Sequence, residues 1–283
     1  MGHELVIYRQ GLYPSPLNKD GFKKHVILIP GFLTEKRALN HGIHDIDDIG
    51  HLKICDWYRH FLNMPLSFNA NVYYFNWPSQ SIHSALQAIG KKLLSIGLNL
   101  SLGPFIPPVL QIFQSLQTPW NDAVEMADLQ AKQLMEDILS LDGEVFIIGH
   151  SLGGRIATRL LEVQEQLDVK KLYIASLAPA ISERELIITQ KKEAIKHEIF
   201  YSKYDMILRF IFRAGESSLV PALGQVGPHH KYRNGLNGID VSSSYFCKKM
   251  GHGDYEEHFM TMIAVRSKMW QEFMSDVYLG DRR

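Results

Sequence analysis

The sequence predicts an α/β fold in which a doubly wound, mostly parallel sheet carries helices on both faces. Short apolar runs alternate with longer helical patterns, and no internal repeat or low-complexity linker divides the chain. The apolar runs are nearly continuous, which suits parallel strands that are covered on both sides. With 283 residues, of which 46% are hydrophobic, the chain can form one large domain with a sizeable core.

Strands are expected where short runs are rich in β-branched and aromatic residues. The clearest runs are residues 25–30 (HVILIP), 71–75 (NVYYF), 144–148 (EVFII), 171–175 (KLYIA) and 198–202 (EIFYS). Residues 4–8 suit an antiparallel edge strand, and residues 239–245 suit a late strand. Helical patterns fit residues 54–62, 122–141, 152–166, 182–194 and 255–277.

One apolar segment departs from this rhythm. From residue 82 to residue 100, apolar side chains recur at spacings of four and three, and no charged residue occurs between Lys92 and Asp122. A Gly/Pro cluster at 103–108 interrupts the run, so two short apolar helices fit better than a transmembrane span. We expect a helical cap or lid insertion over about residues 80–120. Extra core packing and membrane contact through residues 82–117 are the alternatives.

The charge and cysteine content exclude several classes of protein. The 30 basic residues balance the 30 acidic ones, so nothing global favours a nucleic-acid partner. Two cysteines are too few for a disulfide framework, and residues 1–5 lack the basic and apolar segments of a secretory signal. We therefore expect a cytoplasmic protein, with peripheral membrane association through the apolar segment as the one reservation.

A candidate nucleophile lies between a predicted strand and a predicted helix. The run Gly149-His150-Ser151-Leu152-Gly153 satisfies the pattern G-x-S-x-G, with the strand ending at residue 148 and the helix beginning at 152. A one-residue turn from strand to helix strains the serine backbone, and side chains at the two glycines would collide across the turn. Ser151 is therefore predicted to be the nucleophile. His150 is interpreted as a packing residue, because the turn aims it away from Ser151.

Acyl transfer also needs N–H groups that stabilise the developing oxyanion. Leu152, the residue after the nucleophile, supplies the first candidate. The second is expected in the loop after the strand 25–30, where Gly31 lets the backbone approach a substrate carbonyl. Phe32 is the favoured donor in that loop, and Leu33 is the alternative.

The acid and the base are expected in the chain order Ser, acid, His. Asp205 follows the end of the strand 198–202, where a carboxylate can hold an imidazole or cap the helix 206–212. Asp240 and Asp168 are rival acids. His252, between two glycines and before the last helix, is the favoured base. The rival bases are His197, His229, His230 and His258.

These segments resemble the α/β-hydrolase superfamily of serine hydrolases. More loosely, the chain is similar to an uncharacterised hydrolase family that includes the transmembrane and coiled-coil domain proteins, through residues 149–155 (GHSLGGR), 201–205 (YSKYD), 251–255 (GHGDY) and 75–79 (FNWPS). The superfamily resemblance implies one domain over residues 1–283 with an eight-stranded, mostly parallel core, and hydrolysis without a cofactor. The looser one implies lipid-like substrates or proximity to a membrane.

The expected function is a lipase- or esterase-like serine hydrolase that cleaves carboxylic esters through an acyl-enzyme. Its substrate would be a small-molecule acyl ester or a lipid, and it would need no metal. Two alternatives compete with this reading. A metal hydrolase would use the polar loop that contains His41, His44, Asp45, Asp47, Asp48 and His51. A non-catalytic protein would hold a lipid or a partner on a hydrolase fold.

Overall fold

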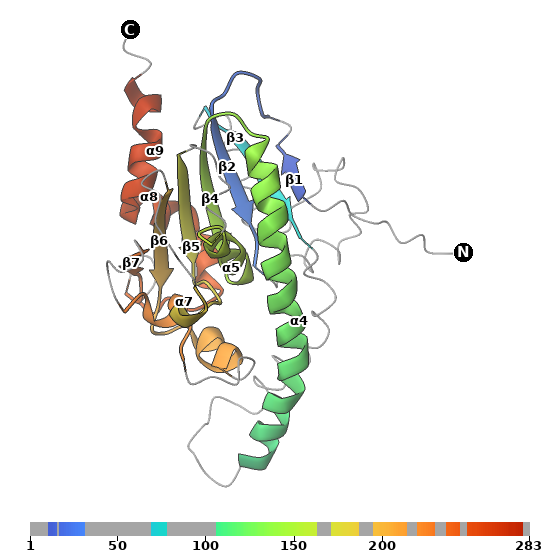
Figure 1. Ribbon diagram of the computed structural model, residues 1–283. Coiled ribbons are helices and arrows are strands. Elements are labelled where there is room, and N and C mark those ends of the chain that lie inside the picture. Colours follow the sequence, from blue (N-terminus) through green and yellow to red (C-terminus); the bar gives the residue numbers. More distant parts are fainter. Residues whose placement is uncertain are drawn as a thin grey trace, which may run out of the picture.

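A seven-stranded sheet forms the centre of the protein (Figure 1). The computed structural model describes residues 11–15, 17–31, 69–77, 106–162 (backbone only for 106–119), 171–186, 195–213, 220–229, 236–243 and 248–279. The strand order is β1-β3-β2-β4-β5-β6-β7, and only the edge pair β1–β3 is antiparallel. The predicted mostly parallel sheet is thus confirmed.

Five strands lie on the five predicted runs. They are β2 (Lys24–Ile29), β3 (Asn71–Asn76), β4 (Glu144–His150), β5 (Leu172–Leu177) and β6 (Ile195–Tyr201). The antiparallel edge strand β1 is Gly11–Pro14, whereas the predicted edge strand 4–8 lies outside the described residues. The last strand, β7 (Leu236–Asp240), overlaps the predicted run 239–245 only at residues 239 and 240, and residues 244 and 245 lie outside the described residues.

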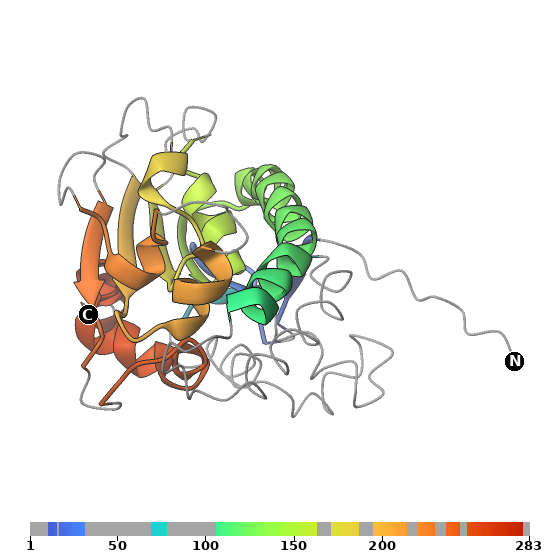
Figure 2. The same cartoon turned by 90° about the horizontal axis from the view of Figure 1, so that it is seen from below.

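Helices cover both faces of the sheet, as the doubly wound prediction requires (Figure 2). Helices α4 (Ile106–Leu139) and α5 (Leu152–Arg159) lie on one face, and α8 (Asp254–Arg266) and α9 (Lys268–Leu279) lie on the other. On the α9 face, the ring of Phe146 in β4 meets Trp270 edge-on, with 4.9 Å between the ring centroids. Such packing fixes α9 against the centre of the sheet.

Three short helices lie between the main elements. They are η4 (Glu183–Glu185), η5 (Leu208–Phe212) and α7 (Leu223–Val226). The helix predicted over 182–194 does not continue past η4, because Leu186 is extended, and residues 187–194 lie outside the described residues. Helix α5 ends at Arg159, earlier than the predicted helix 152–166, of which residues 163–166 lie outside the described residues. The predicted helix 54–62 also lies outside them.

Helix α4 differs from its prediction. It was expected to begin at residue 122, after two separate apolar helices, but it runs for 34 residues from Ile106 to Leu139. The prolines at 107 and 108 do not interrupt it, because they lie in its first turn, where backbone N–H groups have no helical acceptor. The second half of the apolar segment is therefore continuous with the following helix.

The remainder of the predicted cap, residues 80–105, lies outside the described residues, so the cap stays a prediction. Within the part of the chain that is described, no helix combines the length and apolar character needed to cross a bilayer.

The predicted helix 255–277 is divided in two at Ser267. This residue is extended (φ −86°, ψ 115°), and its hydroxyl accepts a hydrogen bond from the N–H of Trp270 at 2.9 Å. Ser267 therefore ends α8 and caps α9 in the manner of an N-cap residue. The break allows α9 to change direction and lie across β4 and β5.

Candidate active site

Ser151 occupies a strained turn between β4 and α5. Its φ of 55° and ψ of −118° lie in a region that residues with side chains rarely adopt, at a cost of about 1–3 kcal/mol. The turn is held by hydrogen bonds: the N–H of Ser151 donates to the carbonyl of Leu177 at 2.9 Å, and its carbonyl accepts from Arg155 at 3.0 Å. The strand–turn–helix setting that the sequence predicted is present.

The two glycines of the motif are required by close backbone approach. A Cβ atom on Gly149 would lie 2.4 Å from the carbonyl oxygen of Gly153, across the turn as predicted. A Cβ atom on Gly153 would meet a different neighbour, the carbonyl oxygens of Ile29 and Pro30, at 2.4 and 2.5 Å. The second glycine thus lets α5 approach the end of β2.

The site lies where the order of the strands reverses. The chain continues from β2 to β3 on one side and then crosses to β4 on the other, so β2 and β4 flank the switch point. Gly31, just after β2, approaches Ser151 so closely that a Cβ atom there would lie 3.1 Å from the Cβ of Ser151. A crevice at the carboxyl ends of parallel strands is where such folds bind ligands.

Of the three predicted oxyanion donors, only Leu152 lies among the described residues. Leu152 is the first residue of α5, so its N–H has no acceptor within the helix. Phe32 and Leu33 lie outside the described residues. The loop that leads to them is fixed at Pro30, whose carbonyl accepts a hydrogen bond from the indole of Trp77 at 3.0 Å, a contact that sequence reasoning missed.

The side chains of Ser151, His252 and Asp205 form one hydrogen-bonded chain. His252 Nε2 lies 2.9 Å from Ser151 Oγ, and His252 Nδ1 lies 2.7 Å from Asp205 Oδ2. Ser151 and His252 are each 8% exposed, and Asp205 is fully buried. Since a carboxylate only accepts, Nδ1 carries the proton and the lone pair on Nε2 faces the serine hydroxyl. This arrangement can transfer a proton from Ser151 to His252.

Asp205 makes two contacts with its two carboxylate oxygens. Oδ2 faces His252, while Oδ1 accepts a hydrogen bond at 2.9 Å from the N–H of Leu208, at the start of the short helix that follows. The same side chain therefore orients the imidazole and caps a helix, the two roles that the sequence left open.

His252 is held in place by contacts of its own loop. The hydroxyl of Ser202, at the end of β6, donates to the carbonyl of Met250 at 2.6 Å, and the N–H of Gly251 donates to Asp254 at 2.7 Å. The backbone on both sides of the imidazole is thus fixed before any ligand binds.

His150 packs beside His252, as its interpretation as a packing residue requires. Its Nε2 lies 3.1 Å from the carbonyl oxygen of His252, and its ring lies between those of His252 and Tyr255. Burial, followed by repulsion from His252, lowers the pKa of His150 well below its ordinary value. His150 is therefore a neutral donor that holds the His252 backbone, and the sequence analysis did not identify this contact.

The rival residues take other positions. His197 lies within β6, and its Nε2 is 2.8 Å from the hydroxyl of Ser176. Asp240 ends β7 and accepts from the N–H of Ser242 at 2.8 Å. His258 lies inside α8, and His229 donates its backbone N–H to Glu183. Asp168 and His230 lie outside the described residues.

The described residues hold no cluster of three or more His, Cys, Asp or Glu side chains that could bind a metal ion. The polar loop that suggested a metal, with His41, His44, Asp45, Asp47, Asp48 and His51, lies outside them.

Strand order, the strained turn at Ser151 and the helices on both faces together decide the fold. It is the α/β-hydrolase fold. Comparison with solved structures finds similar chain paths in esterases. An esterase of Pyrobaculum calidifontis has 14% sequence identity and a TM-score of 0.42, and the match covers 96% of this chain and 87% of that one.

Two further structures are similar at the same level. An esterase of Pyrococcus furiosus has 11% identity and a TM-score of 0.37, with 89% of this chain and 83% of that one covered. A type II thioesterase of the yersiniabactin biosynthetic pathway has 12% identity and a TM-score of 0.41, with coverages of 94% and 98%. No protein-family model matches the sequence, and comparison with curated proteins gives no significant match.

Proposed function

We propose that the protein is a serine hydrolase that cleaves carboxylic esters through an acyl-enzyme, with Ser151 as nucleophile, His252 as base and Asp205 as the acid that orients it. One observation carries the proposal: the hydrogen-bonded chain from Ser151 Oγ through His252 to Asp205, with distances of 2.9 and 2.7 Å. The Ser151 hydroxyl faces an imidazole that can accept its proton, and the imidazole faces the Asp205 carboxylate that can orient it, as acyl transfer requires.

Acylation begins when His252 Nε2 accepts the proton of the Ser151 hydroxyl as Oγ attacks the ester carbonyl carbon. The negative charge that forms on the carbonyl oxygen would be stabilised by the N–H of Leu152, with Phe32 or Leu33 as the second donor. His252 then carries a positive charge, which the buried carboxylate of Asp205 stabilises. The imidazolium gives its proton to the leaving alcohol, and the ester bond breaks.

Deacylation repeats these steps with water. His252 accepts a proton from the water molecule as its oxygen attacks the acyl-enzyme, and then returns that proton to Ser151 Oγ. The acid product leaves and the starting state is restored. No metal or cofactor takes part in this scheme, because the three side chains supply every proton transfer.

Apolar residues between 82 and 117 favour an acyl chain as the substrate group, so a lipase- or esterase-like activity is proposed over peptide hydrolysis. These residues would form the cap or lid over the acyl site. A small-molecule ester or a lipid would fill such a site, and the apolar segment would allow contact with a membrane surface.

Labelling with a fluorophosphonate probe tests this proposal. The wild-type protein should form a covalent adduct on Ser151, whereas Ser151→Ala should not label and His252→Ala should label far more slowly, because its serine lacks a base. Thermal melting of all three proteins serves as the control for folding. Absence of labelling in a folded wild type would contradict the proposal and favour the non-catalytic binding alternative.

A panel of p-nitrophenyl esters from acetate to palmitate then defines the acyl chain. A kcat/KM that rises with chain length would support the lipid-like substrate, and one that falls would support a short-chain esterase. Either trend must disappear in Ser151→Ala if the hydrolysis belongs to this site.

A further inference from the structure

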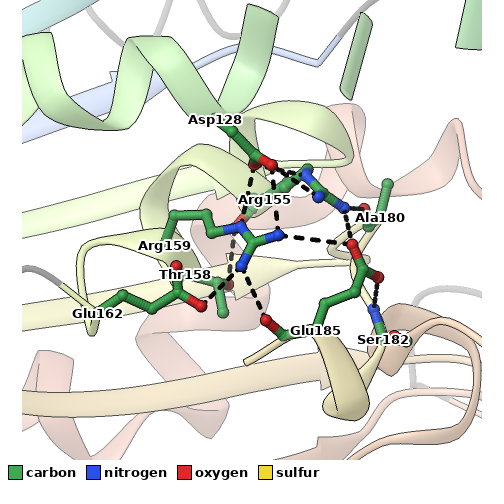
Figure 3. Close-up of polar contacts among 9 residues, drawn as sticks. Asp128, Arg155, Thr158, Arg159, Glu162, Ala180, Ser182 and Glu185 are labelled. Atoms are coloured by element: carbon green, nitrogen blue, oxygen red, sulfur yellow. Dashed lines mark hydrogen bonds and ion pairs between the residues drawn. The ribbon is translucent and has the colours of Figure 1, made fainter. Parts of the chain in front are cut away.

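A buried arginine lies one helical turn after the nucleophile. Arg155 is 1% exposed and belongs to a set of charged side chains, hereafter the ionic cluster, that comprises Asp128, Arg155, Arg159, Glu162 and Glu185 (Figure 3). A cation removed from water to this extent must be fully paired, since an unpaired one would cost several kcal/mol. The contacts of Arg155 therefore indicate what the side chain does.

The guanidinium of Arg155 connects its own helix, α5, to α4, to η4 and to the backbone that follows β5. Its Nε and Nη2 bind the two carboxylate oxygens of Asp128 on α4, at 2.7 and 2.9 Å. Its Nη1 lies 2.7 Å from a carboxylate oxygen of Glu185 in η4 and donates to the carbonyl of Ala180 at 3.2 Å. Figure 3 shows the guanidinium between these partners, with no nitrogen left over.

The contact with Ala180 leads back to the nucleophile. The N–H of Ala180 donates to the carbonyl of Ser151 at 3.1 Å, and the same carbonyl accepts from the N–H of Arg155 at 3.0 Å. Ser151, Ala180 and Arg155 thus form a closed ring of three hydrogen bonds. Because Ser151 is held at a strained φ of 55°, its backbone needs support of this kind from its surroundings.

We propose that Arg155 is a positioning residue that fixes the backbone of Ser151 through the carbonyl of Ala180 and thereby sets the aim of the serine hydroxyl. This inference rests on the proposed function of Ser151. The planar fork of an arginine suits the task, since it binds one carboxylate with two parallel hydrogen bonds and still reaches two other acceptors. A lysine, with one nitrogen, cannot make all four contacts.

Within the ionic cluster, the contacts of Arg155 and Asp128 favour the charged form of both side chains. Burial disfavours the charge on Arg155, but Asp128 and Glu185 outweigh it and raise the pKa of Arg155 above its ordinary value. Burial likewise opposes the charge on Asp128, and the two arginines reverse this and lower the pKa of Asp128. Arg155 therefore keeps its charge and its hydrogen bonds, and it does not transfer a proton during the reaction.

Arg159 provides a matched control within the same cluster. It lies one turn further along α5 and also binds Asp128, at 3.0 Å. Its Nη1 binds Glu162 at 2.6 Å and the carbonyl of Glu185 at 2.8 Å, while its Nη2 donates to the second carboxylate oxygen of Asp128 at 3.3 Å. Replacing Arg159 therefore weakens the same cluster while leaving the ring of Ser151, Ala180 and Arg155 in place.

The test compares Arg155→Lys with Arg159→Lys in an ester hydrolysis assay, with active sites counted by fluorophosphonate titration, below the melting temperature of both variants. Arg155→Lys should lower kcat per active site by about 10- to 100-fold with little change in KM, because the bound substrate meets a misaimed hydroxyl. Arg159→Lys should lower the melting temperature and leave kcat per active site unchanged.

An equal fall in kcat for both variants, or wild-type kcat per active site in Arg155→Lys, would overturn the positioning role. If Arg155→Lys does not fold, Asp128→Asn is tested in its place, because it weakens the paired hydrogen bonds of Arg155 from the carboxylate side. Asp128→Asn must then also lower kcat, by a smaller factor. Unchanged kcat in that variant would also overturn it. Failure of the wild type to label would instead refute the proposed function, and with it this inference.

Discussion

Two polar clusters lie near the start of α5, one at Ser151 and one around Arg155, and they differ in the groups that accompany their carboxylates. The chain Ser151–His252–Asp205 contains a hydroxyl and an imidazole, between which a proton can pass. In the ionic cluster, Arg155 and Asp128 are held in their charged forms by their contacts with each other and with their neighbours. Proton transfer needs side chains that change their protonation state, whereas a fixed geometry needs side chains whose charge stays the same.

The largest expected effect separates the two roles of Asp205. Asp205→Asn removes the negative charge that faces His252 and should lower kcat by roughly 10⁴-fold, because the imidazolium loses its counter-charge and the tautomer is no longer fixed. An amide oxygen can still accept from Leu208, so the unfolding free energy should change little. Ester hydrolysis and urea denaturation measure the two effects.

Asp205→Ala is the matched comparison. It should lose the same activity and also about 1 kcal/mol of stability, since the cap on the helix after β6 is gone. Wild-type kcat in Asp205→Asn would show that the carboxylate only caps the helix, and the comparison of the two clusters would no longer hold.

A smaller effect is expected on the pH dependence of stability. Burial, and after it His252, holds the pKa of His150 well below its ordinary value, so the unfolded chain binds this proton at a higher pH than the folded protein does. The stability that the neutral His150 ring contributes is therefore fully present above about pH 6.5 and is lost as the pH falls towards the lowered pKa. The unfolding free energy then falls by no more than about 1.4 kcal/mol per pH unit.

Urea denaturation of the wild type and His150→Phe at several pH values between neutral and mildly acidic measures this contribution. The variant should show a shallower loss of unfolding free energy below about pH 6.5. Asp128 behaves differently: its pKa is lowered from 3.8, so its contribution is lost only at still lower pH. If the unfolding free energies of the wild type and His150→Phe fell equally with decreasing pH, His150 would not be the cause of the acid sensitivity.

The smallest effect concerns an exposed ion pair. Lys23 and Asp142 contact each other across the turn before β4, but their side chains are 68% and 81% exposed. Lys23→Ala should change the unfolding free energy by no more than about 0.5 kcal/mol, because water screens the pair. A larger loss of unfolding free energy in thermal or urea denaturation would mean that an ion pair stabilises this protein even when it is exposed. Burial would then not distinguish the ionic cluster from a surface pair.

Sequence reasoning was effective where local chemistry has a pattern. The strand before Ser151 and the glycines around it could be identified because a one-residue turn permits few alternatives. Asp205 and His252 were selected by chain order, and their side chains lie within hydrogen-bond distance of each other and, for His252, of Ser151.

The ionic cluster has no such local pattern. Asp128 and Arg155 are 27 residues apart on different helices, and each alone resembles an ordinary charged residue of a helix surface. Helix α4 was mispredicted for a related reason. A pair of prolines can end a helix or begin one, and only the folded chain shows that those at 107 and 108 begin it.

The packing of α9 has a consequence for the order of events during synthesis. His252 precedes α8 and α9, and α9 lies across the middle of the sheet, where Trp270 meets Phe146. A nascent chain that has emerged only as far as residue 248 already contains Ser151 and Asp205 but not His252, the proposed base. The proposed hydrolysis would therefore begin only after the segment that carries His252 has joined the rest of the fold.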